Sequence, residues 1–491
     1  MAQTQYQLDI ELIKKRAVSG VVTFTVRTFF IQAFTFFATF LLTILLDPSI
    51  FGIFFLVSAL INFFVYFSDV GLAAALIQKK EEITKDDLAT TFTIQQFLII
   101  SLVVFGLLFS GKIASFYNLD AQGLLLLRVL IFSLVLSSLK TIPSILLERK
   151  LDFTRLVIPQ VAENLVFYST AVTLAYLNFG ITSFSWAVLA RGVTGLVLIY
   201  ILSPWRPKLS FNKKVAKRLS SFGVPFQANS IMALFKDDFL TVVLGKILSF
   251  AEVGYIGWAQ KWAFVPLRFF MDNVNKVTFP AYSRLQEHSS QLGKAIEKSI
   301  FFVTYFVYPS VFGMVAIAPM IINVIPNYQK WEPAIPLLYL FAVNSLFSAV
   351  STTFTNALFA TGNPKIVLKL MFFWTAATWI LTIPLVIRYG FIGVGIASAI
   401  VAASSIITIY FVKKEVSVSV GKSIFGPLII SILMFVIIKG IQSTLPQNFF
   451  SVILVIISGA IIYFAMSFAV FKNHLKEDFL TITSSLFGKN R

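Results

Sequence analysis

Long apolar segments alternate with short polar segments along most of the chain. A helix needs about 20 apolar residues to cross the hydrocarbon core of a bilayer, because each residue adds about 1.5 Å. By this criterion the pattern predicts an all-α polytopic membrane protein with about fourteen transmembrane helices. The first apolar segment is too long for a signal-peptide core and carries no evident cleavage site, so we expect it to be retained. The predicted spans are 18–46, 49–77, 89–110, 123–146, 156–178, 182–203, 221–245, 252–281, 297–325, 334–360, 364–387, 391–412, 422–440 and 449–471.

Similar short motifs recur at a nearly constant offset. Leu46–Ile53 (LDPSIFGI) leads into the second span, and Leu248–Tyr255 (LSFAEVGY) leads into the eighth, about 202 residues later. We therefore predict two pseudo-symmetric six-helix lobes with parallel topology, an arrangement that lets transporters place a site between two moving halves. The predicted domains are an N-lobe (1–203, spans 1–6), a basic cytoplasmic linker (204–220), a C-lobe (221–412, spans 7–12), and a C-terminal part with spans 13 and 14 and a cytoplasmic tail (413–491).

The composition supports a membrane protein and excludes several kinds of site. Hydrophobic residues make up 57% of the chain and charged residues only 13%, whereas soluble domains average about a quarter charged. The absence of cysteine excludes disulfides and thiolate metal sites. Both histidines, His288 and His474, fall in predicted loops, which argues against a metal site within the membrane. With neither a Walker A motif nor a convincing catalytic constellation, we predict no enzyme activity, no catalytic residues, no metal and no cofactor.

The net charge of +18 reflects membrane topology rather than nucleic-acid binding. If alternate loops are assigned to the two sides of the membrane, one pool holds about 27 Lys and Arg residues and the other about five. The positive-inside rule then places both termini in the cytoplasm and supports an even number of spans. The basic linker Ser203–Ser220 could lie on the anionic inner leaflet, where each basic residue contributes roughly 1 kcal/mol.

Four charged residues in the eighth span form a stripe. Steps of seven, four and four residues place Lys261, Arg268, Asp272 and Lys276 on one helical face. Each ionised group costs roughly 2.5–3.5 kcal/mol at membrane depth, so this face must look into a hydrated cavity or a helix bundle. Either the charges neutralise one another and lock helices together, or they form a cationic wall for an anionic substrate. We favour the cationic wall.

Other spans also contain ionisable residues. Arg27 in the first span either reaches the headgroups or contacts substrate. Arg191 in the sixth span is either a headgroup contact or a cavity residue. Arg128 and Lys140 in the fourth span are interpreted as interface anchors. Asn344, Ser348, Thr352 and Asn356 in the tenth span have the spacing of hydrogen bonds between helices. The predicted substrate-binding residues of a central cleft are Arg27, Lys236, Lys261, Arg268 and Lys276. The gating or coupling candidates are Asp69, Asp237, Asp238, Asp272 and Glu163.

Four stretches carry a resemblance to a known family. They are FSDVGLAAALIQ (67–78), IPSILLERKLDF (142–153), WRPKLSF (205–211), and GYIGWAQKWAFVP followed by FPAYSRLQ (254–286). With them, nearly the whole chain resembles the polysaccharide-transport (Wzx-like) flippases of the multidrug/oligosaccharidyl-lipid/polysaccharide (MOP) exporter superfamily. This resemblance implies two six-helix lobes in a V, and transport of polyprenyl-pyrophosphate-linked oligosaccharide across the bacterial cytoplasmic membrane by alternating access, for O-antigen, capsule or exopolysaccharide synthesis. It also implies a basic cleft, for which Arg27, Lys261 and Arg268 match by depth.

The implied partners are the lipid-linked oligosaccharide, membrane lipids and a possible coupling ion (H⁺ or Na⁺), with no nucleic acid. Flipping such a lipid requires partners for its polar groups inside the membrane, and Lys and Arg donate well to phosphate. An alternative function is an ion-coupled multidrug exporter of the same superfamily, which would prefer an acidic cleft. A membrane glycosyl polymerase or ligase is disfavoured, because no loop on the sparsely charged side exceeds about a dozen residues.

Overall fold

The protein is all-α, as predicted. The computed structural model describes residues 28–66, 71–79, 81–228, 235–236 and 238–487, and helices fill most of these ranges without any strand. Eleven helices of the described residues are long and apolar enough to cross a membrane, so the chain is a multi-pass membrane protein. The predicted count of fourteen spans is not confirmed.

Each of the three predicted spans outside these eleven carries charged residues within its predicted bounds. Helix α7 (Phe153–Tyr176) contains Glu163, and α12 (Phe250–Leu285) contains the predicted charged stripe. Both helices are long enough to span a bilayer, but their polar residues lower the mean hydropathy. In the third, predicted at 221–245, the structure describes helix α11 (Asp238–Ile247) and part of α9 (Lys213–Ala228).

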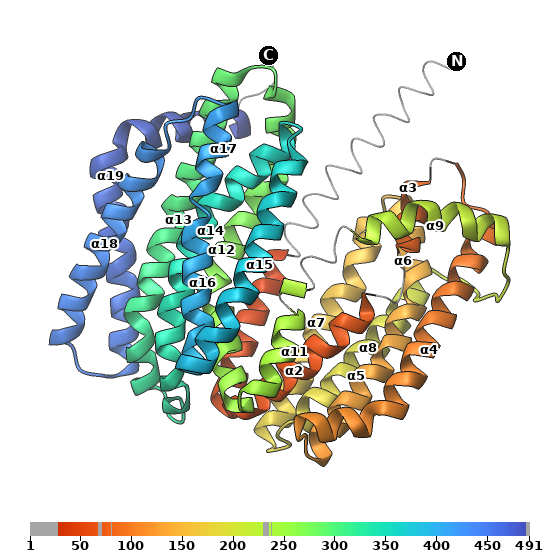
Figure 1. Cartoon of the computed structure of the whole chain (residues 1–491). Helices are drawn as coiled ribbons and strands as arrows, with labels where there is room; N and C mark the ends of the chain where they lie inside the picture. The colour runs from red at the N-terminus through yellow and green to blue at the C-terminus, as the bar shows by residue number, and fades with distance from the viewer. Residues whose placement is uncertain (1–27, 67–70, 80, 229–234, 237, 488–491) are drawn as a thin grey trace. The chain divides into compact units, whose positions relative to one another are not determined.

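Contacts between helices divide the chain into two compact units, Met1–Gly257 and Trp258–Arg491. This division does not test the predicted domain boundaries, which stay predictions. In the first unit α7 and α8 form the most extensive helix pair, and α5 packs against both α4 and α8. Besides α7, α9 and α11, the elements of the first unit are a helix over Thr28–Leu45, α2 (Pro48–Val65), α3 (Leu72–Gln78), α4 (Lys85–Tyr117), α5 (Ala121–Leu139), α6 (Thr141–Arg149), α8 (Thr182–Leu202) and the start of α12 (Figure 1).

The second predicted span is wrong as a single helix over 49–77, because the structure has two helices, α2 and α3, in this range. Gly71, just before α3, adopts φ +74°, a left-handed conformation that glycine tolerates without strain. A β-carbon at Gly71 would collide with the backbone of Gly223 in α9. Glycine therefore serves two purposes here: it turns the chain and lets α9 approach.

The two predicted repeat motifs contact each other at the starts of α2 and α12. A β-carbon on Gly52 would collide with the carbonyl oxygen of Phe250, and a β-carbon on Gly254 would collide with that of Pro48. Pro48 and Gly52 are the counterparts of Phe250 and Gly254 in the predicted repeat. A reciprocal contact between equivalent residues is what a two-fold relation between the segments would produce, and the internal duplication itself stays a prediction.

The predicted linker is a folded part of the first unit. Its portion before α9 hydrogen-bonds α4, where the backbone N–H of Ser210 donates to Thr93 Oγ1 (3.0 Å) and that of Asn212 to Thr90 Oγ1 (3.1 Å). The helix α9 that follows packs on α3 and α4 (Figure 1), with Leu219 in the apolar cluster under it. The linker is thus packed against α3 and the first turns of α4, and is not a loose connection between the two units.

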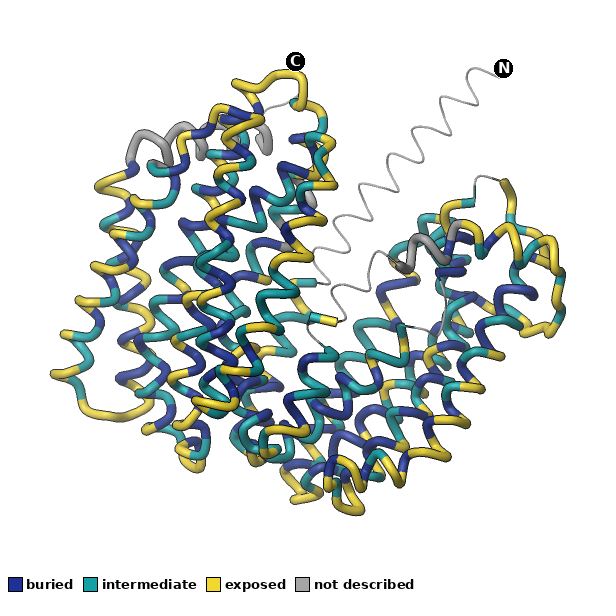
Figure 2. Tube along the Cα trace, in the orientation of Figure 1, coloured by how far each residue is buried: buried dark blue, intermediate teal, exposed yellow. Residues whose placement is uncertain are grey.

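The second unit is built around α13 (Ser289–Val324), which packs against α14 (Ile335–Ala360) and α18 (Val420–Thr444). Its core holds Trp331, which stacks on Trp258 with ring centroids 5.5 Å apart. Figure 2 marks the buried and exposed positions of this unit, and most of its helices carry both. The remaining elements are the rest of α12, η1 (Gln329–Ala334), α15 (Pro364–Tyr389), α16 (Ile392–Ser404), α17 (Ile407–Glu415) and α19 (Phe449–Phe487).

Candidate functional site

The carboxylate of Glu163 lies between two cations inside the first unit. Lys140 Nζ donates a hydrogen bond to Glu163 Oε1 at 2.6 Å, and Arg191 Nε lies 3.6 Å from Glu163 Oε2. The side chains of Lys140 and Glu163 are 18% and 12% exposed, whereas that of Arg191 is 54% exposed. Three different helical segments therefore contribute to one ionic cluster, and its outermost member is a cation.

Two members of the cluster lie near the middle of their helices. Arg191 is near the middle of α8 and Glu163 near the middle of α7, each about 14–15 Å from the nearer end at 1.5 Å per residue. Lys140 lies where α5 ends and α6 begins. Interface anchoring alone does not describe Lys140, because its ammonium pairs with the carboxylate of Glu163. This pairing offsets the cost of a charge within the helix bundle.

Small and aromatic residues shape the space around Glu163. A β-carbon on Gly195, one turn beyond Arg191 in α8, would collide with the carboxylate of Glu163. Glycine at this position therefore makes room for the acid between α7 and α8. The guanidinium of Arg191 also lies over the ring of Phe167, 5.9 Å from the ring centroid, which is a cation–π geometry.

The donors of Arg191 make this cluster an anion-binding candidate. Within the part of the chain that the structure describes, Arg191 has one carboxylate neighbour, contacted through Nε, so its two Nη groups can serve a further acceptor. With two cations around one carboxylate the cluster has a net charge of +1. Polar groups continue along α7, where Asn164 Oδ1 lies 3.1 Å from Thr35 Oγ1 and the buried Gln160 Oε1 lacks a hydrogen-bond partner among the described residues.

The structure leaves most predicted substrate-binding residues as predictions. Lys261 and Arg268 are both exposed on α12. Their spacing of seven residues places them on the same helical face, as expected. The side chains of Asp272 and Lys276 lie outside the described part of the structure, as do the residues Arg27, Asp69 and Asp237 in full. The structure therefore does not test whether the predicted stripe and the other predicted cleft residues line one cavity.

Of the charged motif in the seventh span, Asp238 has a defined partner. The amide nitrogen of Asn62 in α2 donates to Asp238 Oδ1 at 3.2 Å, and Asp238 is the first residue of α11. A carboxylate is favourable at a helix N-terminus because it faces free N–H groups. Lys236 is partly buried close by. The contact with Asn62 favours a helix-packing role for Asp238.

The polar stripe of the tenth span forms hydrogen bonds between helices, as predicted. Asn344 Nδ2 in α14 donates to Ser398 Oγ in α16 at 2.7 Å. One end of the stripe reaches α12, because Asn356 Nδ2 donates to Thr278 Oγ1 at 3.1 Å and to Asn275 Oδ1 at 3.3 Å. These bonds satisfy polar groups that lipid could not satisfy.

Sequence reasoning named Glu163 and left Arg191 open, but it missed their pairing with Lys140. The three residues lie on separate helical segments, so no local spacing connects them. The sequence feature that indicates such a pairing is electrostatic, because a lone acid in an apolar helix requires a cation on a neighbouring helix. The structure shows no group of three or more His, Cys, Asp or Glu residues that could hold a metal ion within the described ranges.

Comparisons with known proteins agree with this architecture. Residues 41–336 match the family model described as "Polysaccharide biosynthesis protein". The chain is 24% identical over 406 residues to the lipopolysaccharide biosynthesis protein WzxC of Escherichia coli K12, covering 82% of this chain and 81% of the relative. It is 23% identical to the succinoglycan biosynthesis transport protein ExoT of Rhizobium meliloti, covering 67% and 65%.

Solved structures of similar fold are transporters. The lipid II flippase MurJ in an inward closed conformation has a TM-score of 0.75 at 17% identity, covering 92% of this chain and all of that one. An inward-facing multidrug resistance transporter of the MATE family and MOP superfamily has a TM-score of 0.57 at 15% identity, covering 77% and 94%. These matches confirm the resemblance that the sequence motifs indicate.

Proposed function

Because the chain belongs to the polysaccharide biosynthesis protein family, we propose that it translocates polyprenyl-pyrophosphate-linked oligosaccharide across the bacterial cytoplasmic membrane. WzxC and ExoT, whose names place them in polysaccharide synthesis, support this substrate class. The fold shared with a lipid II flippase supports the mode of action. Such a transporter is not an enzyme, since translocation neither makes nor breaks a covalent bond of the cargo.

The observation that carries the proposal is a half-exposed arginine, Arg191, near the middle of the apolar helix α8. A diphosphate in hydrocarbon costs several kcal/mol for each unsatisfied polar group, and a guanidinium can donate two parallel hydrogen bonds to phosphate. Arg191 contacts Glu163 through Nε and lies over the ring of Phe167, so its Nη groups remain as donors for a further anion. In the proposed mechanism Arg191 binds the pyrophosphate as it passes the middle of the membrane.

The finer features of transport also belong to this proposal. We place both chain termini in the cytoplasm and assign cleft binding to Arg27, Lys236, Lys261, Arg268 and Lys276. The acids Asp69, Asp237, Asp238, Asp272 and Glu163 are the candidates for gating or for binding a coupling ion (H⁺ or Na⁺). The proposed lobes are 1–203 and 221–412, joined by the linker and followed by the part at 413–491. Their relative motion would open the cleft to one side of the membrane at a time.

Translocation is tested by locating the lipid-linked oligosaccharide on one face of the membrane. In cells that lack this chain and any redundant flippase, we expect the lipid-linked units to be protected from an impermeant glycosidase added to spheroplasts. Restoring the chain should expose them. Arg191→Ala should reduce the exposed fraction at least tenfold at equal protein level, and Arg191→Lys should retain part of it, because lysine keeps the charge but not the planar donor pair.

A matched control is Arg388→Ala, which removes another exposed arginine that contacts an aromatic ring, at the end of α15. This variant should transport like the unchanged protein. If the lipid-linked units reach the outer face without the chain, the proposed function is wrong. If transport survives Arg191→Ala and Arg388→Ala equally, the proposed role of Arg191 is wrong.

The second candidate is an ion-coupled multidrug exporter, which the fold match to a MATE transporter favours. An exporter of cationic drugs would bind cationic dyes in preference to pyrophosphate lipids. Ethidium binding to the purified protein, unaffected by excess polyprenyl pyrophosphate, would support the second candidate over the first.

A further inference from the structure

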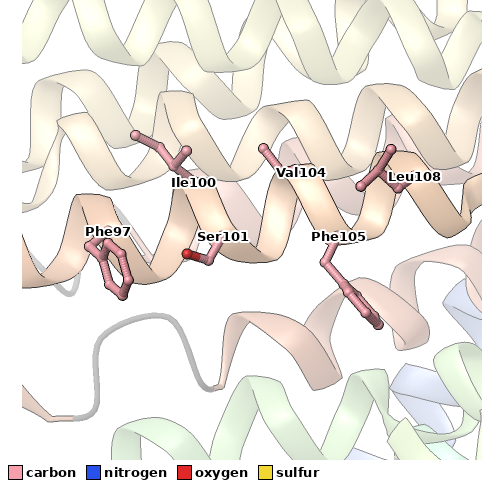
Figure 3. Close-up of a pocket in the computed structure, with 6 residues that line it drawn as sticks. All are labelled: Phe97, Ile100, Ser101, Val104, Phe105 and Leu108. Atoms are coloured by element: carbon pink, nitrogen blue, oxygen red, sulfur yellow. The ribbon is translucent and has the colours of Figure 1, made fainter.

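The linker segment before α9 and one face of α4 have no part in the proposed transport role. The face of α4 carries a groove of about 460 Å³, lined by Phe97, Ile100, Ser101, Val104, Phe105 and Leu108. Figure 3 shows these side chains in two parallel rows along the helix, with Ile100, Val104 and Leu108 in one row and Phe97, Ser101 and Phe105 in the other. All six residues are exposed, so the groove faces outward from α4.

The groove and the linker meet on the same helical face. Thr90 and Thr93, which hold the linker backbone, precede Phe97 by seven and four residues. Residues at these spacings share one side of an α-helix. The linker segment is therefore attached one turn before the groove begins.

The length of α4 places this attachment near the edge of the hydrocarbon core. The helix has 33 residues, or about 50 Å, which exceeds a core of about 30 Å. Thr93 lies about 28 Å along the axis from Lys112, an exposed cation whose Nζ contacts the ring of Phe109 at 5.3 Å. A lysine near a helix end typically reaches toward the headgroups. Thr93 and Lys112 therefore mark the two boundaries, and the groove lies between them.

The linker exposes apolar and basic side chains together at this boundary. Leu209 and Phe211 are 73% and 61% exposed, and they alternate with Ser210 and Asn212, whose backbone is hydrogen-bonded to α4. The neighbouring cations are all exposed: Arg206, Lys208, Lys213, Lys214 and Lys217.

We propose that this linker segment and the α4 groove bind one anionic phospholipid of the bilayer. The phosphate contacts the basic side chains around Leu209 and Phe211, and one acyl chain lies in the groove. The groove extends over eleven helical steps from Phe97 to Leu108, about 16 Å, which is close to the thickness of one leaflet's hydrocarbon. The cluster of five cations at one end supplies charge complementarity for an acidic headgroup.

The site is tested by lipid retention on the full chain. Protein reconstituted in nanodiscs of phosphatidylcholine with 20% phosphatidylglycerol is released into mild detergent, and bound lipids are counted by native mass spectrometry. We expect one retained phosphatidylglycerol per chain. The triple variant K208Q/K213Q/K214Q should lower retention at least tenfold, because each basic residue near an anionic surface contributes substantially to binding.

A second pair of variants tests the groove. Ser101→Phe places a ring between the two rows and should reduce retention at least fivefold. Val197→Phe adds the same bulk to an exposed position on α8 and should change nothing. Since the chain has no cysteine, Phe211→Cys can also carry a single nitroxide. Its accessibility to oxygen should place it within the bilayer, whereas a nitroxide at Lys217→Cys should be in water.

Three results would overturn the proposal. One is equal retention of phosphatidylcholine and phosphatidylglycerol, and another is retention insensitive to both the lysine and the Ser101 variants. The third is displacement of the retained lipid by stoichiometric undecaprenyl pyrophosphate, which would assign the site to cargo. Because transport is not the readout, the proposal can fail or succeed independently of the flippase function.

Discussion

Replacement of Glu163 by glutamine would separate the structural and transport roles of the ionic cluster. Glutamine has nearly the same shape and can still accept one hydrogen bond from Lys140 Nζ, but it removes the negative charge. Lys140 is then left mostly buried beside a second cation, Arg191. Removing one partner of a buried ion pair typically costs about 3–5 kcal/mol.

The contact distances indicate that the two cations contribute unequally to this loss of stability. The contact with Lys140 is a hydrogen bond of 2.6 Å between buried groups, whereas the contact with Arg191 is 3.6 Å long and half-exposed, a class that contributes about 0–1 kcal/mol. Because glutamine keeps one hydrogen bond, we expect Glu163→Gln to destabilise the protein by about 3 kcal/mol. Most of this loss should come from Lys140.

The double variant Lys140→Met/Glu163→Gln tests this reasoning. Methionine removes the buried ammonium, so the double variant should recover about 2 kcal/mol relative to Glu163→Gln alone. The assay is reversible unfolding in mixed micelles with increasing SDS, monitored by circular dichroism. Equal stability of Glu163→Gln and the unchanged protein, or strictly additive losses in the double variant, would refute a buried ion pair between Lys140 and Glu163.

Three further predictions concern packing. Gly52→Val should destabilise the first unit by more than 2 kcal/mol in the same assay, because the valine side chain would collide with the backbone of Phe250. The control Gly440→Ala should be neutral, because a β-carbon at Gly440 has open space around it. Asp87→Asn should weaken the bonds from Lys79 Nζ (2.6 Å) and from Arg218 Nη2 in α9 (2.7 Å) to this buried carboxylate. Trypsin should then cleave within α9 severalfold faster. The control Asp86→Asn, at an exposed neighbouring position, should not change the cleavage rate. Asn356→Ala should cost about 1–2 kcal/mol in that assay by leaving its partners on α12 without a donor, and an unchanged stability would contradict these hydrogen bonds.

The apolar segments predicted the helices well because membrane helices must satisfy every backbone group internally and cover it with apolar side chains. The sequence failed where a helix ends inside an apolar segment. The break before α3 depends on Gly71 and on the approach of α9 through Gly223, a residue about 150 positions away. No local pattern encodes such a contact.

The site was partly predictable for a related reason. The cost of ionised groups in hydrocarbon identified Glu163 as a residue that cannot face lipid, and the structure agrees. The identity of its partners depended on how α5, α7 and α8 pack, which the helical periodicity of each segment does not determine. Lys140 lies near the end of its predicted span, and its position along one helix does not reveal a partner on another helix.

A carboxylate next to the proposed pyrophosphate-binding arginine is expected of a site that must release its cargo. Two unopposed cations in a low-dielectric environment would hold a diphosphate too tightly for transport. Glu163 neutralises Lys140 through the short contact and competes with phosphate for Arg191 through the long one. The anion then gains one half-exposed guanidinium rather than a fixed pair of cations. Glu163→Gln should therefore bind a soluble pyrophosphate analogue more tightly than the unchanged protein while transporting more slowly, whereas a purely structural carboxylate would leave the affinity unchanged.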